Sequence, residues 1–252
     1  MVGCWHAIQD PTVTETLRDL DLDFLVFDQQ HVAMTIESLQ SSFIALRPSK
    51  LAALVRMLRN DAADIGQVLD AGADGVIVPM VNTEEDARHA VAAVKYRPDG
   101  IRSFGPRRAL LRYDSLDAFI AEANDSIVIV QIETAEAVAN LDAILSVPGL
   151  SAVMIGPGDL AISLGFFDDL RNPAVDVVVQ SVLDRCRERD VPFGIFTDSI
   201  ETSLAWIDRG ALIINCYADL GFVTDGMTRM AAEFAGARAR KGPSAERVDE
   251  GR

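Results

Sequence analysis

Residues 127–134 read Ile-Val-Ile-Val-Gln-Ile-Glu-Thr, a nearly unbroken apolar run that ends in a carboxylate. Such a run is typical of a strand that is buried on both faces, as strands are in a parallel sheet. Seven other short apolar runs share this character, and each is followed by a segment with helix signals. The eight expected strands are residues 2–5, 24–27, 51–55, 75–78, 127–132, 152–155, 193–196 and 212–215.

The alternation of strand and helix predicts βα units, and eight units predict an α/β fold of the (β/α)₈ TIM-barrel type. Glycines stand where helices should stop before the next strand, as at Gly72 and Gly210. We expect one barrel domain over residues 1–236 and a disordered tail over 237–252, because the end of the chain lacks an apolar stripe. Residues 97–115, rich in Pro, Gly and Arg, are expected to form a long loop over one face of the barrel.

Composition excludes several classes of function. The chain has 252 residues with 23 Lys+Arg and 38 Asp+Glu, a formal net charge of −15. This charge argues against nucleic acid or an anionic membrane as a partner. The cysteines Cys4, Cys186 and Cys216 are odd in number and far apart, which predicts reduced thiols rather than disulfides or a zinc site. With no apolar leader at the start, we expect a cytoplasmic protein.

Polar residues follow several of the expected strands. Asp28 and His31 follow the second strand, Arg56 the third, Glu133 the fifth and Asp159 the sixth. In a TIM barrel the carboxyl ends of the strands meet at one face, where the chemistry gathers. A histidine, an arginine and two acids from four strands therefore predict a site there, against the alternative of solvated loop residues.

Glu133 and Asp159 are separated by about one βα unit, so both carboxylates are expected at neighbouring strand ends. Two carboxylates suit a hard divalent cation such as Mg²⁺ or Mn²⁺, and the alternative is a salt bridge or a helix cap. None of the three lysines is expected at a strand end, which argues against Schiff-base chemistry. Backbone N–H groups in the stretch Gly156-Pro157-Gly158 could hold a substrate carboxylate.

With these residues in place, the chain resembles the 2,4-dihydroxyhept-2-enedioate aldolase family of class II, metal-dependent pyruvate aldolases, which is related to citrate lyase beta subunits. The resemblance runs from about residue 2 to residue 234. The motifs that carry it are Asp28-Gln29-Gln30-His31, Val55-Arg56, Val78-Pro79-Met80-Val81, the loop at 100–109, Gln131-Ile132-Glu133-Thr134 and Gly156-Pro157-Gly158-Asp159.

The resemblance implies an aldehyde-lyase that reversibly cleaves a 4-hydroxy-2-oxo acid to pyruvate and an aldehyde, through an enolate that Mg²⁺, Mn²⁺ or Co²⁺ stabilises. It implies Glu133 and Asp159 as metal ligands, Arg56 as the group that holds the pyruvyl oxygens, and His31 as the acid and base. Asp70 would be the partner of this histidine, and Asp28 would be the aspartate beside it. By sequence alone, the alternative that Asp70 is a helix-end residue is favoured. The implied lining of the substrate pocket is Gln131, Gly156, Pro157 and Gly158.

Two departures from the family pattern leave alternatives open. Gln30 stands where the family usually has a glutamate, and His6 stands where it tends to have an apolar residue. His6 either faces the substrate or is a core histidine with its hydrogen bonds satisfied. A CoA-thioester lyase of the malyl-CoA or citryl-CoA type is one alternative function, with a basic path at Arg102, Arg107 and Arg108. A catalytically silent relative that binds an oxo acid is another.

The resemblance also implies a homo-oligomer, a hexamer or trimer, in which neighbouring subunits can exchange the last helix. Residues 220–234 carry apolar side chains at helical spacing. Such a helix could pack against a partner subunit or against the core of its own barrel.

Overall fold

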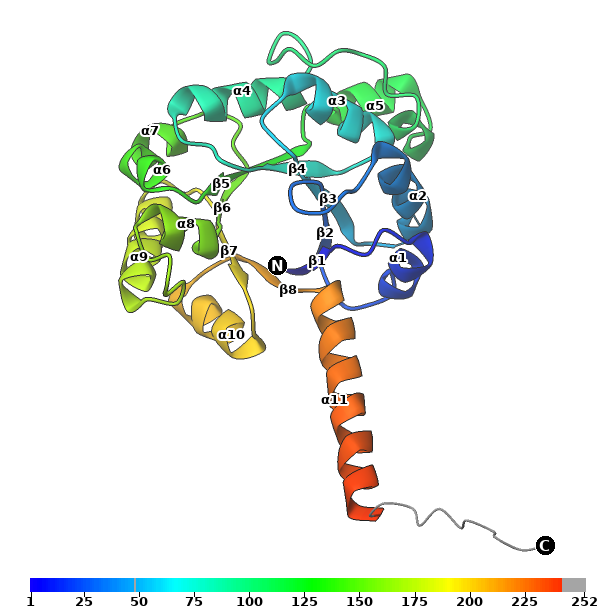
Figure 1. The fold of residues 1–252 in the computed structure, drawn as a ribbon. Helices are drawn as coiled ribbons and strands as arrows, with labels where there is room; N and C mark the ends of the chain where they lie inside the picture. Colours follow the sequence, from blue (N-terminus) through cyan, green and yellow to red (C-terminus); the bar gives the residue numbers. More distant parts are fainter. Residues whose placement is uncertain (48, 242–252) are drawn as a thin grey trace, which may run out of the picture.

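Eight parallel strands form a closed barrel in the computed structural model, which describes residues 1–47 and 49–241 (Figure 1). Each strand pairs with the next one along the chain, and the last pairs with the first. The strands are β1 (Val2–His6), β2 (Phe24–Asp28), β3 (Ala52–Arg56), β4 (Gly75–Val78), β5 (Ile127–Ile132), β6 (Ala152–Ile155), β7 (Phe193–Thr197) and β8 (Ile213–Ala218). The predicted α/β barrel is confirmed, and every expected strand overlaps an observed one.

Helices alternate with the strands and surround the barrel (Figure 1). They are α1 (Pro11–Leu17), α2 (Ile36–Leu46), α3 (Ala62–Ala71), α4 (Glu84–Val94), the 3₁₀ helix η1 (Ala109–Arg112), α5 (Leu116–Glu122), α6 (Ala135–Ala139), α7 (Leu141–Leu145), α8 (Pro157–Ser163), α9 (Pro173–Glu188), α10 (Ile200–Arg209) and α11 (Asp219–Lys241). None in the described part of the chain is long and apolar enough to cross a lipid bilayer.

Local residue chemistry sets the ends of several helices. Asp10 caps α1 through its side chain, and Pro11 occupies the first turn, where its missing N–H costs nothing. Thr83 opens α4 in a reciprocal capping box. Gly72 and Gly210 end α3 and α10 with φ of 108° and 101°, a left-handed conformation that glycine adopts without steric cost.

The apolar core of the barrel has two layers, and a separate small cluster at η1 and α5 is formed by Ala109, Phe119 and Ala123. One layer fills the inside of the barrel, and the other lies between the sheet and the surrounding helices. Successive strand residues alternate between the two, because side chains of a strand point to opposite faces. The inner layer consists of Trp5, Phe24, Val26, Leu54, Ile77, Ile129, Ala152, Met154 and Ile213. The barrel is therefore a packed core rather than a pore, and a site must lie at one of its ends.

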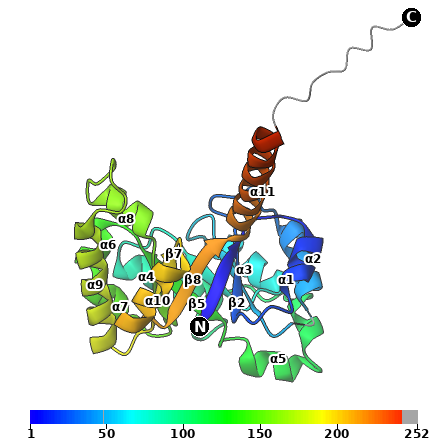
Figure 2. The same cartoon turned by 90° about the horizontal axis from the view of Figure 1, so that it is seen from below.

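The two ends of the barrel carry different structures. Helices α8 and α11 begin at the carboxyl ends of β6 and β8, and α5 lies at the opposite end (Figure 2). The long loop at 97–115 contains η1 and belongs to that opposite end. Its residues Arg102 and Ala109 line one cavity together with Asp74 and Ile127, which lie at the beginnings of β4 and β5.

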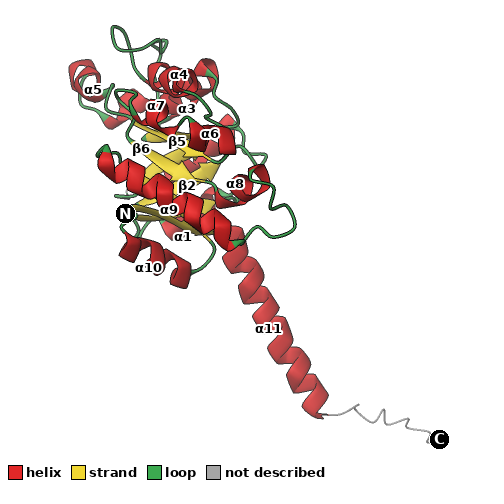
Figure 3. Ribbon diagram, turned by 90° about the vertical axis from the view of Figure 1, so that its left-hand side faces the viewer, coloured by secondary structure: helices red, strands yellow, loops and turns green. Residues whose placement is uncertain are grey.

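Helix α11 projects away from the barrel (Figure 3). Its apolar side chains are 46–62% exposed, so this helix does not pack on the core of its own barrel. They are Leu220, Phe222, Val223, Met227, Met230 and Phe234. The helix continues to Lys241, beyond residue 237, where the tail was expected to begin. The rest of the expected tail, residues 242–252, lies outside the described residues.

Candidate active site

Arg56 and Asp28 form a buried ion pair at the carboxyl ends of neighbouring strands. They are the last residues of β3 and β2, and the strand register places them opposite one another. Arg56 Nε and Nη2 donate to the two Asp28 carboxylate oxygens at 2.9 and 2.6 Å. The guanidinium carbon also lies 4.1 Å from the centre of the Trp5 ring. A bidentate pair against an aromatic face holds the guanidinium in one orientation.

The turn after β2 places His31 beside this pair. Asp28 Oδ1 accepts the backbone N–H of Gln30 at 3.0 Å and that of His31 at 3.4 Å. The His31 side chain is exposed, whereas Asp28 and Arg56 are buried. The Asp28 carboxylate therefore orients the Arg56 guanidinium and also stabilises the turn that carries His31. The resemblance matches Asp28 to the aspartate beside this histidine, and in the structure the Asp28 carboxylate accepts the backbone N–H of His31.

Glu133 is a buried carboxylate with both oxygens engaged. It follows β5 and is 1% exposed. Oε1 accepts the Met80 N–H at 2.7 Å, and Oε2 accepts Gln131 Nε2 at 3.1 Å. Burial raises the pKa of the Glu133 carboxyl and the Asp159 carboxylate adds to the rise, while the Met80 N–H and the Arg56 guanidinium oppose it. Glu133, Asp159 and Arg56 stand at or just after the carboxyl ends of β5, β6 and β3, so all three belong to the same end of the barrel.

Met80 contributes through its backbone, a role that the sequence did not reveal. It follows Pro79 after β4 and has φ of 55°, in the left-handed region that non-glycine residues rarely adopt. This conformation accompanies the hydrogen bond from its N–H to Glu133. Strain of this kind persists where the surrounding structure holds it, often at functional sites. Nothing in the residue type signals such a conformation.

The junction of β6 and α8 is packed against Glu133. A Cβ added to Gly156 would lie 2.5 Å from Glu133 Oε2, so only glycine lets the backbone approach the carboxylate this closely. Pro157 occupies the first turn of α8. A Cβ added to Gly158 would meet nothing within 4 Å. Asp159 follows in the same turn and is exposed. The expected substrate-lining residues thus lie next to both candidate metal ligands.

The donor set at this junction fits a hard divalent cation. Glu133 and Asp159 supply carboxylate oxygens, and the buried Oε1 of Gln131 has no hydrogen-bond partner. Within the described residues, no group of three or more His, Cys, Asp or Glu side chains could hold a metal. Mg²⁺ and Mn²⁺ are commonly held by one or two carboxylates, with water and substrate oxygens as the other ligands. The two carboxylates are therefore sufficient for this kind of ion.

Asp70 lies far from this site in the same chain. It is the penultimate residue of α3, a helix of 10 residues that starts after β3 and runs about 15 Å back toward the other end of the barrel. Its carboxylate pairs with Arg102 Nη2 at 2.6 Å. The expected contact between Asp70 and His31 is thus wrong within a single chain, because the length of α3 separates them.

The basic path expected for a CoA thioester is also far from the site. Arg102 is engaged with Asp70, and Arg108 Nη1 donates to the Ala71 carbonyl at 2.8 Å. Both contacts lie at the end of α3, away from the carboxyl ends of the strands. These arginines stabilise the carboxyl end of a helix and a neighbouring loop.

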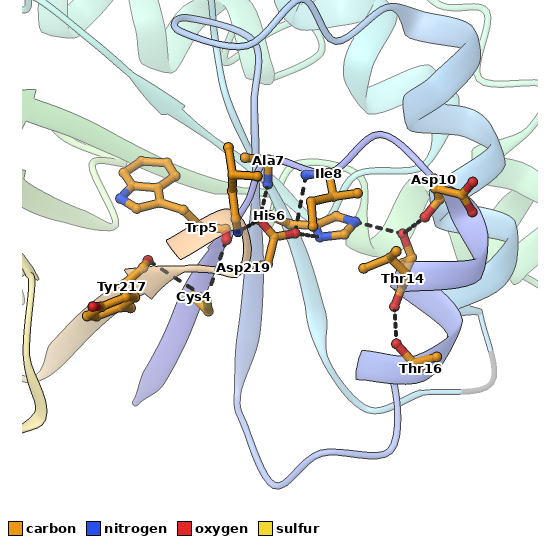
Figure 4. Close-up of polar contacts among 12 residues, drawn as sticks. Cys4, Trp5, His6, Ala7, Ile8, Asp10, Thr14, Thr16, Tyr217 and Asp219 are labelled. Carbon is orange, nitrogen blue, oxygen red and sulfur yellow. Dashed lines mark hydrogen bonds and ion pairs between the residues drawn. The ribbon is translucent and has the colours of Figure 1, made fainter. Parts of the chain in front are cut away.

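His6 is a core histidine with both ring nitrogens bonded (Figure 4). It is fully buried, with Nδ1 2.6 Å from Asp219 Oδ2 and Nε2 2.7 Å from Thr14 Oγ1. Asp219 also accepts the N–H groups of Ala7 and Ile8 at 2.9 and 3.2 Å. Of the two interpretations left open by the sequence, the structure supports the satisfied core histidine. The network ties β1 to the start of α11.

The sequence family follows from a comparison with known proteins. A model of the HpcH/HpaI aldolase/citrate lyase family matches residues 1–225, which include all eight strands and every candidate site residue. The chain belongs to the HpcH/HpaI aldolase/citrate lyase family. The family is one of divalent-metal-dependent enzymes, and this HpcH/HpaI member is a lyase of the aldolase class.

Two curated relatives match this HpcH/HpaI chain over nearly its whole length. The 4-hydroxy-2-oxo-heptane-1,7-dioate aldolase of Salmonella arizonae is 32% identical over 245 residues, 96% of this chain and 93% of the relative. The 5-keto-4-deoxy-D-glucarate aldolase of Escherichia coli is 31% identical over 234 residues, 92% of this chain and 91% of the relative. The names show aldolases with different substrates at similar distance from this chain.

Solved structures share the fold closely. An HpcH/HpaI aldolase from Desulfitobacterium hafniense has a TM-score of 0.87 at 26% identity, covering 92% of each chain. The citrate synthase SbnG has a TM-score of 0.84 at 29% identity, covering 94% of this chain and 93% of its own. Macrophomate synthase has a TM-score of 0.81 at 26% identity, covering 94% of this chain and 85% of its own. One fold therefore supports several reactions, and the site must decide the substrate.

Proposed function

We propose that this HpcH/HpaI enzyme reversibly cleaves a 4-hydroxy-2-oxo acid to pyruvate and an aldehyde, with Mg²⁺ or Mn²⁺ as cofactor. The observation that carries the proposal is that the Glu133 and Asp159 carboxylates and the buried, Asp28-paired guanidinium of Arg56 stand at the carboxyl ends of strands of one barrel. When bound, the cation would polarise the keto group and stabilise the negative charge of the enolate. Co²⁺ is a further candidate for the same oxygen donors.

Arg56 is suited to binding the oxygens of the 2-oxo acid. Its Nε and Nη2 are held by Asp28, which leaves Nη1 outside this pair. A guanidinium that is fixed in advance stabilises negative charge as it develops, because no reorganisation is needed during the reaction. The buried position strengthens that interaction, since less water screens it.

His31 is suited to moving the proton of the 4-hydroxyl group. Its side chain is exposed at the same strand ends, and its backbone is tied to Asp28. Imidazole can take up and give back a proton near neutral pH. In the cleavage direction it would accept the hydroxyl proton as the carbon–carbon bond breaks. In the direction of synthesis it would return that proton to the new alkoxide.

Exchange of pyruvate methyl protons with deuterium tests the proposal, because it reports enolate formation without an aldehyde. We expect NMR to show exchange with Mg²⁺ or Mn²⁺ and none after EDTA. Glu133→Ala and Asp159→Ala should abolish it, whereas Glu136→Ala, at an exposed position on α6, should retain it. Exchange that persists after EDTA, or its absence with every divalent metal, would overturn the proposal.

We also propose that the enzyme works as a homo-oligomer, a trimer or hexamer. The support is the apolar face of α11, which its own barrel leaves exposed. Burying such a face against another subunit would remove it from water and supply association energy. Exchange of α11 between subunits is one arrangement that would achieve this.

A further inference from the structure

A cavity of about 600 Å³ lies beside the candidate active site, on the outer side of the barrel wall. Its lining comes from α8, α9, β7 and α10, which neighbour one another in Figure 1, and from residues just before α9 and just after β7. Val175, Val179, Ile195 and Trp206 form an apolar floor, and each is at most 4% exposed. The lining also includes polar side chains, among them Asn172, Asp176 and Thr202, and its buried apolar part suits a hydrocarbon group better than a hydroxylated chain.

The cavity is continuous with the first turn of α8. Pro157 and Gly158 belong to its lining, and the next residue, Asp159, is a candidate metal ligand. The absence of atoms within 4 Å of a Cβ added to Gly158 leaves open space at this point. A molecule held between Glu133 and Asp159 could therefore extend a substituent past Gly158 into the cavity.

Polar groups around the cavity already have partners. Arg171, the one cationic residue of the described lining, pairs with Asp198, which follows β7. The hydroxyl of Thr197 is 2.6 Å from that of Ser203. A second carboxylate on the substrate would need an unpaired cation to offset its loss of hydration, and this lining provides none. The cavity therefore discriminates against an aldehyde with an anionic end.

We propose that this cavity binds the substituent of the aldehyde, and that the substituent is an apolar alkyl or aryl group. The inference rests on the proposed aldol function and extends it to the class of the second substrate. In synthesis, C3 of pyruvate loses one proton and bonds to the aldehyde carbonyl carbon. The electrons of the carbonyl π bond move to the carbonyl oxygen, and the resulting alkoxide takes up one proton. Cleavage is the same process in reverse, with the apolar group held in the cavity throughout.

The aldehyde preference of the wild-type enzyme tests this directly. We would measure kcat/KM for addition of pyruvate to acetaldehyde, butanal and hexanal, with glyceraldehyde and succinic semialdehyde as polar and anionic counterparts. Each methylene group that enters the cavity should raise kcat/KM about fourfold. Hexanal should therefore exceed every other aldehyde of this set. A flat series, or a preference for either polar counterpart, would overturn the inference.

Two phenylalanine variants on α9 locate the subsite. Val179→Phe fills the cavity, whereas Val177→Phe adds the same ring at a side chain that is 70% exposed. The ratio of kcat/KM for hexanal to that for acetaldehyde should fall about tenfold in the first variant and stay near the wild-type ratio in the second. Equal ratios in both variants would overturn the assignment.

Circular dichroism and thermal unfolding would verify the fold of each variant. If Val179→Phe does not fold because the core is overpacked, Val179→Ala takes its place. The larger cavity should then shift the preferred chain length from hexanal toward octanal, and an unchanged preference would count against the inference.

Metal-dependent deuterium exchange of pyruvate is measured in parallel. Its loss in the wild type would signal failure of the aldol function, whereas exchange without the expected aldehyde preference would signal failure of the cavity assignment alone.

Discussion

Arg56 depends on its neighbours for its orientation. Its guanidinium is held by both Asp28 oxygens and by the Trp5 ring. Lysine could keep the charge at this position, but its ammonium is a point charge that cannot form the same two parallel hydrogen bonds. The planar shape of arginine therefore matters as much as its charge.

Arg56→Lys should lower kcat/KM for aldol cleavage by about 100-fold, the usual scale for losing an oriented group that stabilises an oxyanion. Steady-state kinetics on a 4-hydroxy-2-oxo acid would measure this. Arg59→Lys is the control, because Arg59 is 66% exposed and pairs with Asp64 on α3. If Arg56→Lys retained activity within a few-fold of the wild type, the orienting role would be wrong.

The pair of His6 and Asp219 links the barrel to α11 through buried hydrogen bonds. Burial alone would raise the pKa of the Asp219 carboxyl, but hydrogen bonds from His6, Ala7 and Ile8 outweigh it and the pKa is lowered. A carboxyl whose pKa is lower in the folded state stabilises the fold above its unfolded pKa. That contribution disappears as the pH falls through the lowered value.

Asp219→Asn should therefore lower the thermal unfolding temperature at pH 7 by several degrees. The difference from the wild type should shrink as the pH falls below the ordinary aspartate value of 3.8. Differential scanning calorimetry between pH 3 and 7 would follow it. A difference that stays constant, or that grows toward low pH, would contradict the proposed stabilisation.

At the scale of elements, the junction of β6 and α8 determines the geometry around Glu133. Helix α8 begins directly after the strand, with Gly156 at its cap and Asp159 in its first turn. The close approach of Gly156 to Glu133 lets one short segment place a second carboxylate beside the first. The same turn also borders the proposed aldehyde cavity.

Gly156→Ala should weaken Mn²⁺ binding and lower turnover by at least tenfold, because the new methyl group would displace the Glu133 carboxylate. Calorimetric titration with Mn²⁺ and steady-state kinetics would measure the two effects. Gly66→Ala is the matched control, since its Cβ would meet nothing within 4 Å and its position is within α3. Equal metal affinity in both variants would argue against this steric account.

At the scale of the whole molecule, the barrel separates its functions between two ends. The candidate active site and the start of α11 share the carboxyl end, and the loop at 97–115 belongs to the other end (Figure 2). Helix α11 leaves the barrel with its apolar face exposed. This arrangement makes the helix available to another subunit without covering the mouth of its own barrel.

Met227→Glu should convert the proposed oligomer to smaller species, because a charge in a buried apolar interface is costly. Sedimentation velocity at micromolar concentration would measure the change. Ala232→Glu adds the same charge about half a turn around the helix and should leave the assembly intact. A wild-type monomer, or two variants with identical sedimentation, would refute the proposed role of α11.

Sequence patterns predicted the barrel because burial on both faces of a parallel sheet leaves a strong local signal. Each of the eight apolar runs, such as residues 127–132, became a strand of the closed barrel. The signals of helix caps are equally local, since Thr83 begins one helix and Gly210 ends another through their own residue chemistry. The polar residues at strand ends were visible for the same reason, since topology alone brings Arg56 and Glu133 to one face.

Contacts between distant segments were decided only by the tertiary structure. The end of α3 takes Asp70 away from His31, and the end of β1 brings His6 to Asp219. The left-handed backbone of Met80 and the cavity beside Gly158 have no signature in residue type. The amino-acid sequence determined the strands, the caps and which chemical groups meet at the barrel mouth, because these follow from local burial patterns. Tertiary packing decided the partner of each group, because partners depend on helix length, direction and close approach in space.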